Sequence, residues 1–586
     1  MAVEKLIVDH IDTWTTARQT RSTAGRGSSG KIDLYGIKKL RELILELAVR
    51  GKLVPQDPND EAASELLKRI AAEKAELVKQ GKIKKQKPLP EISEEEKPFE
   101  LPVGWEWVQI SEIGHDWGQK TPDEDFTYID VGSINKEYGI IEKPSILSAK
   151  DAPSRARKIV QKGTVIYSTI RPYLLNIAII ESVFSPEPIA STAFAIIHPY
   201  TAMNANFIYY YLRSPVFINY VESCQTGVAY PAINDKQFFS GIIAVPPSSE
   251  QVRITKKIKE LMSLCDQLEQ HSLISLDAHQ QLVETLLTTL TDSQNANELA
   301  ENWARISEHF DTLFTTEASI DALKQTILQL AVMGKLVPQD PNDEPASELL
   351  KRIAQEKAQL VKDGNIKKKK PLPPISSEEK LFKLPKGWEW CKLEYIAKNE
   401  ENSLKAGPFG SALKKSMYVE NGFKIYGQEQ VISGDEDYGD YFINEDKYNS
   451  LISCKVQPKD MLISLVGTIG KVLILSEKCK PGIINPRLVK LSLYDDISRD
   501  YVKYLLSSPL IQKMLFEDSH GSTMNVLNLG LLKKLALPLP PIKEQFEIVK
   551  RIHLLNTIID NLKSHIKSAQ QTQLHLADAL TDAAIN

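Results

Sequence analysis

The sequence predicts an α+β protein in which two mixed α/β domains are separated by long helices that form an antiparallel coiled coil, with an internal two-fold repeat. Three observations lead to this fold class. One segment is written twice, two stretches carry a heptad pattern of apolar residues, and the segments between them contain short strand-like runs. With 586 residues the chain is long enough for several domains.

The repeated segment defines the organisation of the chain. GKLVPQDPNDEAASELLKRIAAEKAEL at 51–77 returns as GKLVPQDPNDEPASELLKRIAQEKAQL at 334–360, and only three positions differ. The match continues at the same offset, where LPVGWEW (101–107) returns as LPKGWEW (384–390). A repeat of this kind indicates one structural unit used more than once. We therefore expect two copies of one frame.

A second repeat follows each copy of the first. PPSSEQ (246–251) matches PPIKEQ (540–545). The residues between the two repeats differ, at about 108–204 in the first half and 391–498 in the second. The order is frame, variable domain and helix, and then the same again. A frame kept nearly identical is expected to meet one kind of partner twice, whereas unlike inserts are expected to meet two different targets.

A heptad pattern follows each PPxxEQ motif. The apolar seam positions are Ile254, Ile258, Leu261, Cys265 and Leu268 in the first copy, and Ile548, Ile552, Leu555, Ile559, Leu562 and Ile566 in the second. Spacings of four and three residues place them on one stripe of a helix, the seam of a coiled coil. Each helix can run about 40 residues, or roughly 60 Å. The alternative is a helical hairpin inside an ordinary core.

The variable segments are predicted to be mixed α/β with short strands. The strand-like runs are 163–170, 176–180, 192–199, 460–470 and 487–493. Each variable domain is expected to close with one helix, at about 204–223 and 498–518. The expected domains are an N-terminal helical frame and linker (1–107), a first recognition domain (108–245), a central region with a long helix and the repeated frame (246–390), a second recognition domain (391–540) and a C-terminal helix (541–586).

The frame itself contains charged helices and linkers. Residues 61–80 and 344–363 are predicted to be charged amphipathic helices, followed by basic, proline-ended linkers at 82–90 and 365–373. The lysine runs in those linkers are expected to be solvated, with phosphate contact as the alternative. The tryptophans of the two GWEW motifs, Trp105, Trp107, Trp388 and Trp390, are expected to anchor the core rather than to stack on bases.

No motif in the sequence indicates catalysis. GRGSSGKI (25–32) superficially matches a phosphate-binding loop, but Ile32 stands where the Mg²⁺-binding Ser or Thr belongs and no apolar strand precedes it. Neither a methyltransferase loop nor a nuclease cluster of acidic residues and lysine is found. The five cysteines are far apart, which excludes a zinc ribbon and a disulfide framework. We expect a non-enzymatic chain without a metal or cofactor of its own.

Composition favours a cytoplasmic protein. No apolar run approaches the ~18 residues of a membrane span, and the N-terminus lacks the pattern of a secretory signal. The formal net charge is −4, whereas DNA-binding chains are usually basic. If this chain binds DNA, its basic residues are localised or its partners supply much of the phosphate contact.

Several loop residues suit the recognition of DNA bases, because guanidinium, hydroxyl and amide groups bind base edges and binding residues concentrate on loops of a rigid scaffold. In the first domain they are Ser154, Arg155, Arg157, Lys158, Thr169, Arg171, Tyr173, Gln225 and Thr226. In the second they are Ser411, Lys414, Lys415, Asn485, Arg487, Ser522 and Thr523. The alternatives are ordinary solvated charges and plain turns. Two different variable domains on matching frames would suit a bipartite, non-palindromic DNA site.

These motifs in combination resemble a known family. LRELILELAVRGKLVPQDPNDEAASELL, LPxGWEW, SRARK…GTVIYSTIRPYL, GPFGSALKK and the PPxxEQ heptad segments resemble the specificity (S) subunit of type I restriction–modification enzymes. The long N-terminal frame is similar to the type IB (EcoAI-like) subgroup. The resemblance covers nearly the whole chain.

The resemblance implies a function and a set of partners. Each of two target recognition domains would bind one half of a split double-stranded DNA sequence. The chain would recruit two methylating (M) subunits and, through them, two restriction (R) subunits that translocate and cleave DNA. S-adenosylmethionine, ATP and Mg would act on those partner subunits. The alternatives are a scaffold whose variable domains bind proteins, and a fused enzyme with unrecognised motifs.

Overall fold

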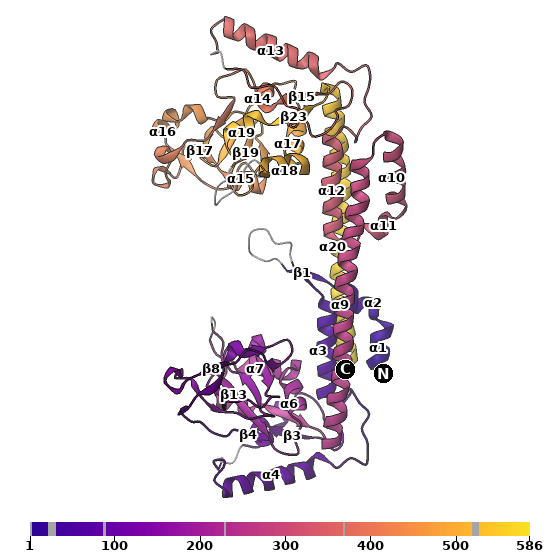
Figure 1. The fold of residues 1–586 in the computed structure, drawn as a ribbon, viewed down its shortest axis with the longest axis vertical. Helices are drawn as coiled ribbons and strands as arrows, with labels where there is room; N and C mark the ends of the chain where they lie inside the picture. Colours follow the sequence, from indigo (N-terminus) through magenta and orange to yellow (C-terminus); the bar gives the residue numbers. More distant parts are fainter. Residues whose placement is uncertain are drawn as a thin grey trace. The chain divides into compact units, whose positions relative to one another are not determined.

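The structure is a computed structural model that describes residues 3–21, 31–85, 90–227, 230–366, 370–517 and 527–585 (Figure 1). The chain forms two compact units. The first unit is Met1–Ser275 together with Ser568–Asn586, and the second is Leu276–Lys567. The glycines of the GRGSSGKI segment, Gly25 to Gly30, lie outside the described residues.

The recognition domain of the first unit contains two four-stranded sheets. One has the order β11-β10-β13-β4, and the other β8-β5-β12-β9. β5 and β12 are parallel, and the remaining pairs are antiparallel. The strands are β4 (Gly114–His115), β5 (Phe126–Ile129), β8 (Ser145–Leu147), β9 (Ala156–Ile159), β10 (Val165–Ser168), β11 (Ile177–Ile179), β12 (Pro188–Ser191) and β13 (Phe194–Pro199). A short pair, β6 (Ile134–Asn135) and β7 (Ile140–Ile141), adjoins them.

The second unit repeats this plan with different sequence. Its sheets have the orders β16-β22-β19-β20 and β18-β17-β21, and β17 and β21 are the parallel pair. The strands are β16 (Leu404–Ala406), β17 (Phe423–Tyr426), β18 (Phe442–Ile443), β19 (Met461–Ser464), β20 (Val472–Ile474), β21 (Gly482–Ile484) and β22 (Leu488–Leu491). Two short helices, α15 (Gln428–Ser433) and α16 (Glu445–Ser450), accompany β17 and β18. The central strands β10 and β19 therefore occupy equivalent places.

Each recognition domain closes with two helices rather than the single helix expected from the sequence. In the first domain α6 (Ala205–Leu212) is followed by α7 (Pro215–Cys224), and in the second α17 (Arg499–Ser507) is followed by α18 (Pro509–Glu517). Proline lacks an N–H and suits the first position of a helix, so it ends one helix and begins the next. A short helix then precedes the last strand of each domain, α8 (Asp235–Ser240) or α19 (Leu529–Lys534).

The last strand of each domain pairs with the strand that carries the GWEW motif. β3 (Glu106–Gln109) pairs with β14 (Ile242–Val245), and β15 (Glu389–Lys392) pairs with β23 (Ala536–Leu539), both antiparallel. This pairing joins the strand that begins each domain to the strand that ends it. The helices that adjoin these strands are α4 (Ala63–Lys79) and α5 (Ile110–Ile113) in the first unit, and α13 (Ala346–Lys362) and α14 (Leu393–Ile396) in the second.

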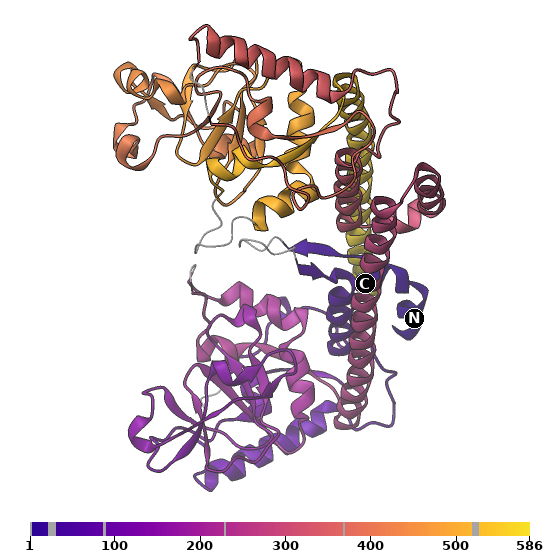
Figure 2. The same ribbon diagram turned by 45° about the horizontal axis from the view of Figure 1, so that its top comes forward.

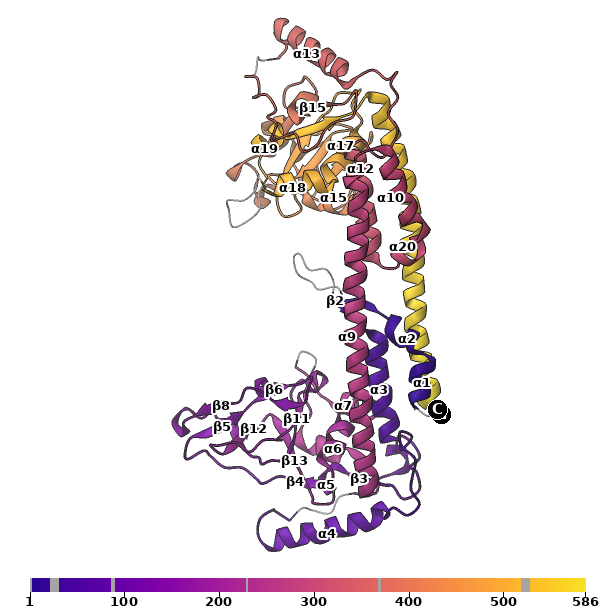
Figure 3. The same ribbon diagram turned by 45° about the vertical axis from the view of Figure 1, so that its right-hand side comes forward.

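The long helices are α9 (Ser248–Asp292) and α20 (Ile542–Ile585). They run antiparallel (Figure 3). In the second unit they pack with α12 (Glu317–Val332) around Val283, Leu287, Ile320, Leu323, Ile327 and Ile559. In the first unit α9 contacts α3 (Tyr35–Val49), since Arg41 forms ion pairs with Asp266 and Glu269. The Tyr35 hydroxyl donates to Asp578 of α20 at 2.7 Å.

The predicted antiparallel coiled coil is thus confirmed, and a third helix from the repeated frame joins it in each unit. The remaining elements are α1 (Val3–Asp9), α2 (Ile11–Thr16), β1 (Gln19–Arg21) and β2 (Lys31–Asp33) in the first unit, and α10 (Ala296–Glu308) and α11 (Phe310–Leu313) in the second. Among the described residues, no helix combines the length and apolarity needed to cross a membrane.

Candidate nucleic-acid interface

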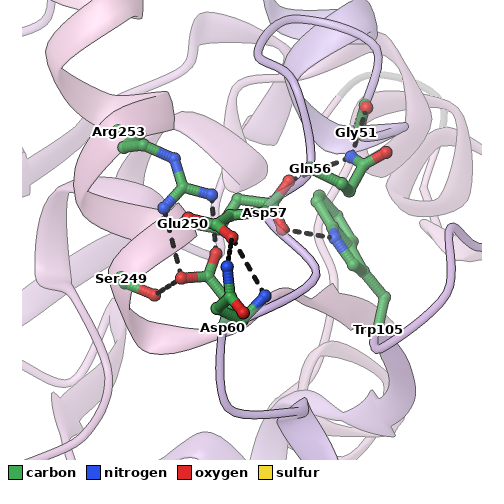
Figure 4. Close-up of polar contacts among 9 residues, drawn as sticks. Gly51, Gln56, Asp57, Asp60, Trp105, Ser249, Glu250 and Arg253 are labelled. Carbon is green, nitrogen blue, oxygen red and sulfur yellow. Dashed lines mark hydrogen bonds and ion pairs between the residues drawn. The ribbon is translucent and has the colours of Figure 1, made fainter.

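The three frame motifs of the first unit meet at one junction (Figure 4). Glu250 of PPSSEQ accepts a hydrogen bond from the Trp105 indole at 3.0 Å and another from the Gln56 amide at 3.0 Å. The same amide donates to the Gly51 carbonyl at 2.8 Å. Glu250 is 1% exposed, and its burial raises the pKa of the carboxyl above the usual value.

An ion pair completes this junction. Arg253 of α9 donates to both carboxylate oxygens of Asp60, at 3.3 and 2.6 Å, and the Ser249 hydroxyl also donates to Asp60. These hydrogen bonds, led by that of Arg253, lower the pKa of Asp60. These contacts bond the PQDPND turn to the beginning of the long helix. The junction therefore supports the recognition domain that follows it.

The second unit reproduces the junction. The Trp388 indole donates to Glu544 at 2.9 Å, and Gln339 donates to Glu544 at 3.1 Å and to the Gly334 carbonyl at 2.7 Å. Lys543 pairs with Asp343 at 3.6 Å, where the first unit has the Arg253 pair. Burial again raises the pKa of the glutamate. The two frames therefore hold unlike domains through the same Trp–Glu and Gln–Glu hydrogen bonds, while the ion pair to the aspartate differs.

The burial expected of the frame tryptophans is confirmed for one of each pair. Trp105 and Trp388 are 5% and 4% exposed. Trp107 and Trp390 are half-buried and lie against Phe99 and Phe382, with ring centroids 5.0 and 5.2 Å apart. Trp105 and Trp388 therefore anchor the core as the sequence predicted, whereas Trp107 and Trp390 pack at its edge.

In the first recognition domain, two loops proposed from sequence lie side by side. The loop that follows β10 is bonded to the segment that follows α7. The Arg171 amide donates to the Pro231 carbonyl at 2.8 Å, and the Ile233 amide donates to the Thr169 carbonyl at 3.0 Å. Thr226 and Ala232 exchange two backbone hydrogen bonds of 2.9 Å. Residues 169–176, 225–227 and 230–233 thus form one backbone-supported surface.

This surface carries two exposed tyrosines and one half-buried cation. The Arg171 guanidinium lies 4.7 Å from the ring centroid of Tyr230. Tyr230 is 68% exposed and Tyr173 is 51% exposed. Arg171 has φ of 51°, in the left-handed region that non-glycine residues rarely adopt. Such local strain is often found at functional sites. We did not single out Tyr230 from the sequence, because the loop pairing that brings it to Arg171 is not local in sequence.

Other residues proposed for this domain have structural contacts. The Thr169 hydroxyl is buried and donates to the Ala193 carbonyl at 2.9 Å. Lys158 is 4% exposed and pairs with Asp235 at 3.1 Å, which ties β9 to the beginning of α8. The Gln225 side-chain oxygen is buried and has no hydrogen-bond partner among the described residues, while Thr226 is exposed. These groups support the loops or lie beside them.

The SRARK segment lies on a different part of the domain. Ser154 and Arg155 are exposed in the turn before β9. Arg157 is half-buried and donates to the Ala156 carbonyl at 3.1 Å. β9 belongs to the sheet β8-β5-β12-β9, whereas the loop that carries Arg171 follows β10 of the other sheet.

In the second recognition domain, the loops after β19 and β21 come together. The Leu465 amide donates to the Arg487 carbonyl at 2.9 Å. The Arg487 guanidinium donates to the Gln428 side chain at 3.3 Å, and Gln428 donates to the Ser464 hydroxyl at 2.9 Å. Asn485 accepts from the Arg487 amide at 2.9 Å, which forms a tight turn. Gln428 has no distinguishing sequence signal and was not predicted.

A glycine-rich loop approaches this turn closely. A Cβ at Gly407 would lie 1.9 Å from the Asn485 carbonyl oxygen, so only glycine fits. The loop then exposes Phe409, Ser411, Lys414 and Lys415, and Phe409 is 77% exposed. The predicted basic loop and the predicted Asn–Pro–Arg turn therefore lie side by side.

The supporting backbone bonds are equivalent in the two domains. The Leu527 amide donates to the Leu465 carbonyl at 2.9 Å, in the place of the bond between Ile233 and Thr169. Ser522 and Thr523, which we also proposed from sequence, lie outside the described residues. In the part of the chain that the structure describes, no group of three or more His, Cys, Asp or Glu residues is placed to hold a metal ion.

Known proteins with similar sequences cover the whole chain. Residues 102–278 and 385–570 match the type I restriction modification DNA specificity domain. The chain is 51% identical to the type I restriction enzyme EcoAI specificity subunit of Escherichia coli and 49% identical to the EcoEI specificity subunit of the same organism, each over 100% of both chains. The solved HsdS subunit from Thermoanaerobacter tengcongensis is 22% identical, with 83% of this chain and 98% of that chain covered and a TM-score of 0.40.

Proposed function

The chain belongs to the specificity subunits of type I restriction–modification systems, which direct methylation and restriction, and from this we propose that each recognition domain binds one half of a bipartite, asymmetric DNA target. The recognition domains proposed are 108–245 and 391–540. The coiled-coil helices between them serve as a spacer that fixes the separation of the two half-sites.

The observation that carries this proposal is the paired-loop surface of each domain. In each, the residue after the central strand, Thr169 or Leu465, accepts a backbone hydrogen bond from the segment before α8 or α19, donated by Ile233 or Leu527. A backbone held from both sides presents side chains in a fixed geometry, as recognition of base edges requires. Because the side chains on the two surfaces differ, the two half-sites differ in sequence.

In the first domain we assign base recognition to Arg171 with Tyr173. Arginine binds guanine O6 and N7 as a fork, worth about 1–3 kcal/mol of discrimination. Thr226 lies on the same surface. Ser154, Arg155 and Arg157 on the other sheet are proposed to contact phosphates, which position a protein without specifying sequence. Lys158, Thr169 and Gln225 take part as supports of these loops.

In the second domain we assign base recognition to Arg487 and Asn485. Gln428 holds the Arg487 guanidinium. Ser411, Lys414 and Lys415 are proposed as phosphate contacts from the neighbouring loop, since lysine acts as a point charge toward phosphate. Both domains would therefore combine one base-reading turn with a cationic loop.

The duplicated junction supports two copies of one partner. We propose that two M subunits bind the two matching frames, and that two R subunits join through them. Adenine would be methylated in the M subunits after base flipping, and S-adenosylmethionine, ATP and Mg would bind to the partner subunits. The expected place of action is the cytoplasm, where the DNA and these partners are found.

The decisive experiment maps modified adenines after co-expression of the chain with its M subunit. We expect one split, asymmetric motif. Arg171→Ala should relax the bases specified in the first half-site by about 10-fold or more, in line with the loss of one bidentate contact, and should leave the second half-site unchanged. Lys236→Ala, at an exposed lysine of α8, is the matched control.

Two outcomes would contradict the proposal. If the complex methylates no defined motif and shows no sequence-dependent DNA binding, the chain is a scaffold whose variable domains bind proteins. If Arg171→Ala leaves both half-sites unchanged while the wild type has a split motif, the assignment of Arg171 is wrong and another residue on the surface reads the first half-site.

A further inference from the structure

A groove lies in the frame of the first unit, beside the GWEW motif. One wall is the linker after α4, at residues 90–101, and the other is β3 with the first turn of α5. The groove has a volume of about 890 Å³, and its lining includes Glu91, Glu94, Glu100, Glu106, Trp107 and Gln109. All of these residues belong to the described part of the chain. We call this cavity the first-frame groove.

The walls of the first-frame groove are held by contacts within the first unit. α4 lies beside the recognition domain of that unit (Figures 1 and 2). There Glu73 accepts hydrogen bonds from the Thr201 amide and the Thr201 hydroxyl, both at 3.0 Å. The Gln109 side-chain amide donates to the Pro90 carbonyl at 3.1 Å, which joins the end of β3 to the linker. The groove is therefore a structured part of the frame.

The first-frame groove is acidic. Residues 90–112 contain seven glutamates and one lysine. Glu94 pairs with that lysine, Lys97, at 2.6 Å. Glu91, Glu100 and Glu106 are exposed, and their carboxylates form no hydrogen bond or ion pair with another described residue. Like charges gathered in one place repel each other, and a bound cation would remove that repulsion.

A buried amide points to the same kind of ligand independently. Gln109 is 5% exposed and lines the groove, and its side-chain oxygen has no hydrogen-bond partner among the described residues. Buried polar atoms normally have a partner. A glutamine oxygen and a carboxylate only accept hydrogen bonds, whereas ammonium and guanidinium groups only donate them. The groove therefore matches a cationic donor.

The second frame fills the equivalent position with a cation of its own. Lys392 stands in the place of Gln109 and is 2% exposed. Its ammonium pairs with Glu379 of the linker of the second unit at 3.7 Å, as a buried charge requires. Residues 373–395, the equivalents of 90–112, contain four glutamates and four lysines. The second frame is thus neutralised internally, whereas the first leaves its acceptors open to a cation from another molecule.

We propose that the first-frame groove binds a lysine- or arginine-bearing segment of the M subunit that sits on the first frame. The inference rests on the proposed function, in which two M subunits bind the two frames, and adds that they are held by unequal contacts. The occupant is a protein segment because the groove adjoins the GWEW motif, which both frames share. An arginine there could also lie over the ring of Trp107, since guanidinium groups bind aromatic faces.

The test titrates the M subunit onto the full chain without DNA and measures the affinity of the two binding steps by calorimetry. For E91Q/E106Q, we expect one step to weaken by about 3- to 10-fold, on the scale of one or two exposed ion pairs, and the other to stay unchanged. The difference should vanish near 1 M salt, where the Debye length is about 3 Å. The matched control is E124Q/E137Q, which removes the same charge from exposed positions in the recognition domain of the same unit.

Two further measurements sharpen the test. Gln109→Lys, which copies the second frame, should weaken the same step because the groove then carries its own cation. A photocrosslinking amino acid at exposed position Glu100 of the otherwise unaltered chain should form adducts with an M-subunit peptide that contains lysine or arginine. Unchanged steps in both variants, equal weakening of both steps, or crosslinks only to lysines of this chain would overturn the groove proposal. If the wild-type chain bound no M subunit, the proposed function itself would be wrong.

Discussion

The two recognition domains share a strand plan but place their side-chain chemistry on different elements. In the first, the loop after β10 carries the cation, and Arg171 lies over Tyr230 from the segment after α7. In the second, the corresponding loop after β19 is the small sequence LVGTIG. There the cation Arg487 comes from the turn after β21 and is held by Gln428 of α15. One backbone bond beneath the loop nevertheless recurs, from Ile233 to Thr169 in the first domain and from Leu527 to Leu465 in the second.

This difference shows which part of the architecture is free to vary. The frame junctions keep their contacts to within a few tenths of an ångström, with Trp105 and Trp388 bonded to Glu250 and Glu544 at 3.0 and 2.9 Å. The contacts that change are those above the central strands. On the proposed function, one half of the target could therefore change without the other, because each domain has its own junction with the frame.

The largest expected effect concerns the shared junction. Trp105→Ala and Trp388→Ala should each destabilise their own unit by about 3–5 kcal/mol, because each removes a buried indole and one of the two donors to a buried carboxylate. Scanning calorimetry should show a lowered transition of similar size in both variants. Trp107→Ala, at a half-buried ring, is the control and should cost less. A large loss in one variant and none in the other would show that the two junctions are not equivalent.

A smaller effect is expected at the residues that position the two arginines. Gln428→Ala should reduce discrimination at the second half-site only, and Tyr230→Ala at the first half-site only. Each change leaves the guanidinium in place but removes its support, so we expect a loss of about 3- to 10-fold, on the scale of one hydrogen bond or an exposed cation–π contact. Half-site discrimination is measured by methylation rates on duplexes with single base changes. An effect of either variant on both half-sites would contradict independent seating.

The architecture was largely predictable because the frame is repeated. Two copies of the GKLVPQDPND, GWEW and PPxxEQ motifs, with heptads after the last, are enough to place the long helices. The single closing helix was wrong because Pro215 and Pro509 each begin a new helix. The participation of α3 and α12 in the bundles was also missed. Their partners, such as Asp578 for Tyr35, lie hundreds of residues away.

The candidate surface was predictable only in part. Arg171 and Arg487 stand out as cations at strand ends, a signal that is local in sequence. Tyr230 and Gln428 do not, because their contacts arise from pairing of distant loops. Lys158 looked like a DNA contact in its SRARK run, but its ammonium is buried against Asp235. Sequence reports the charge of such a residue and not the direction in which the fold points it.

The smallest expected effect tests whether the two junction carboxylates behave alike. Burial raises the pKa of Glu250 and of Glu544. The folded chain therefore retains a proton that the unfolded chain has already lost as pH rises above the ordinary carboxyl pKa. It follows that stability contributed by each group falls with rising pH in that window and then levels off above the raised pKa.

Glu250→Gln and Glu544→Gln should each flatten this dependence, by at most about 1.4 kcal/mol per pH unit for one proton. Melting temperatures measured between pH 4.5 and 7 provide the check, with Glu547→Gln at an exposed position of α20 as the control. If the melting temperature of either variant fell more steeply with pH than that of the wild type, the Trp and Gln donors would stabilise the charged carboxylate. Burial would then not be the dominant influence on the pKa at that junction.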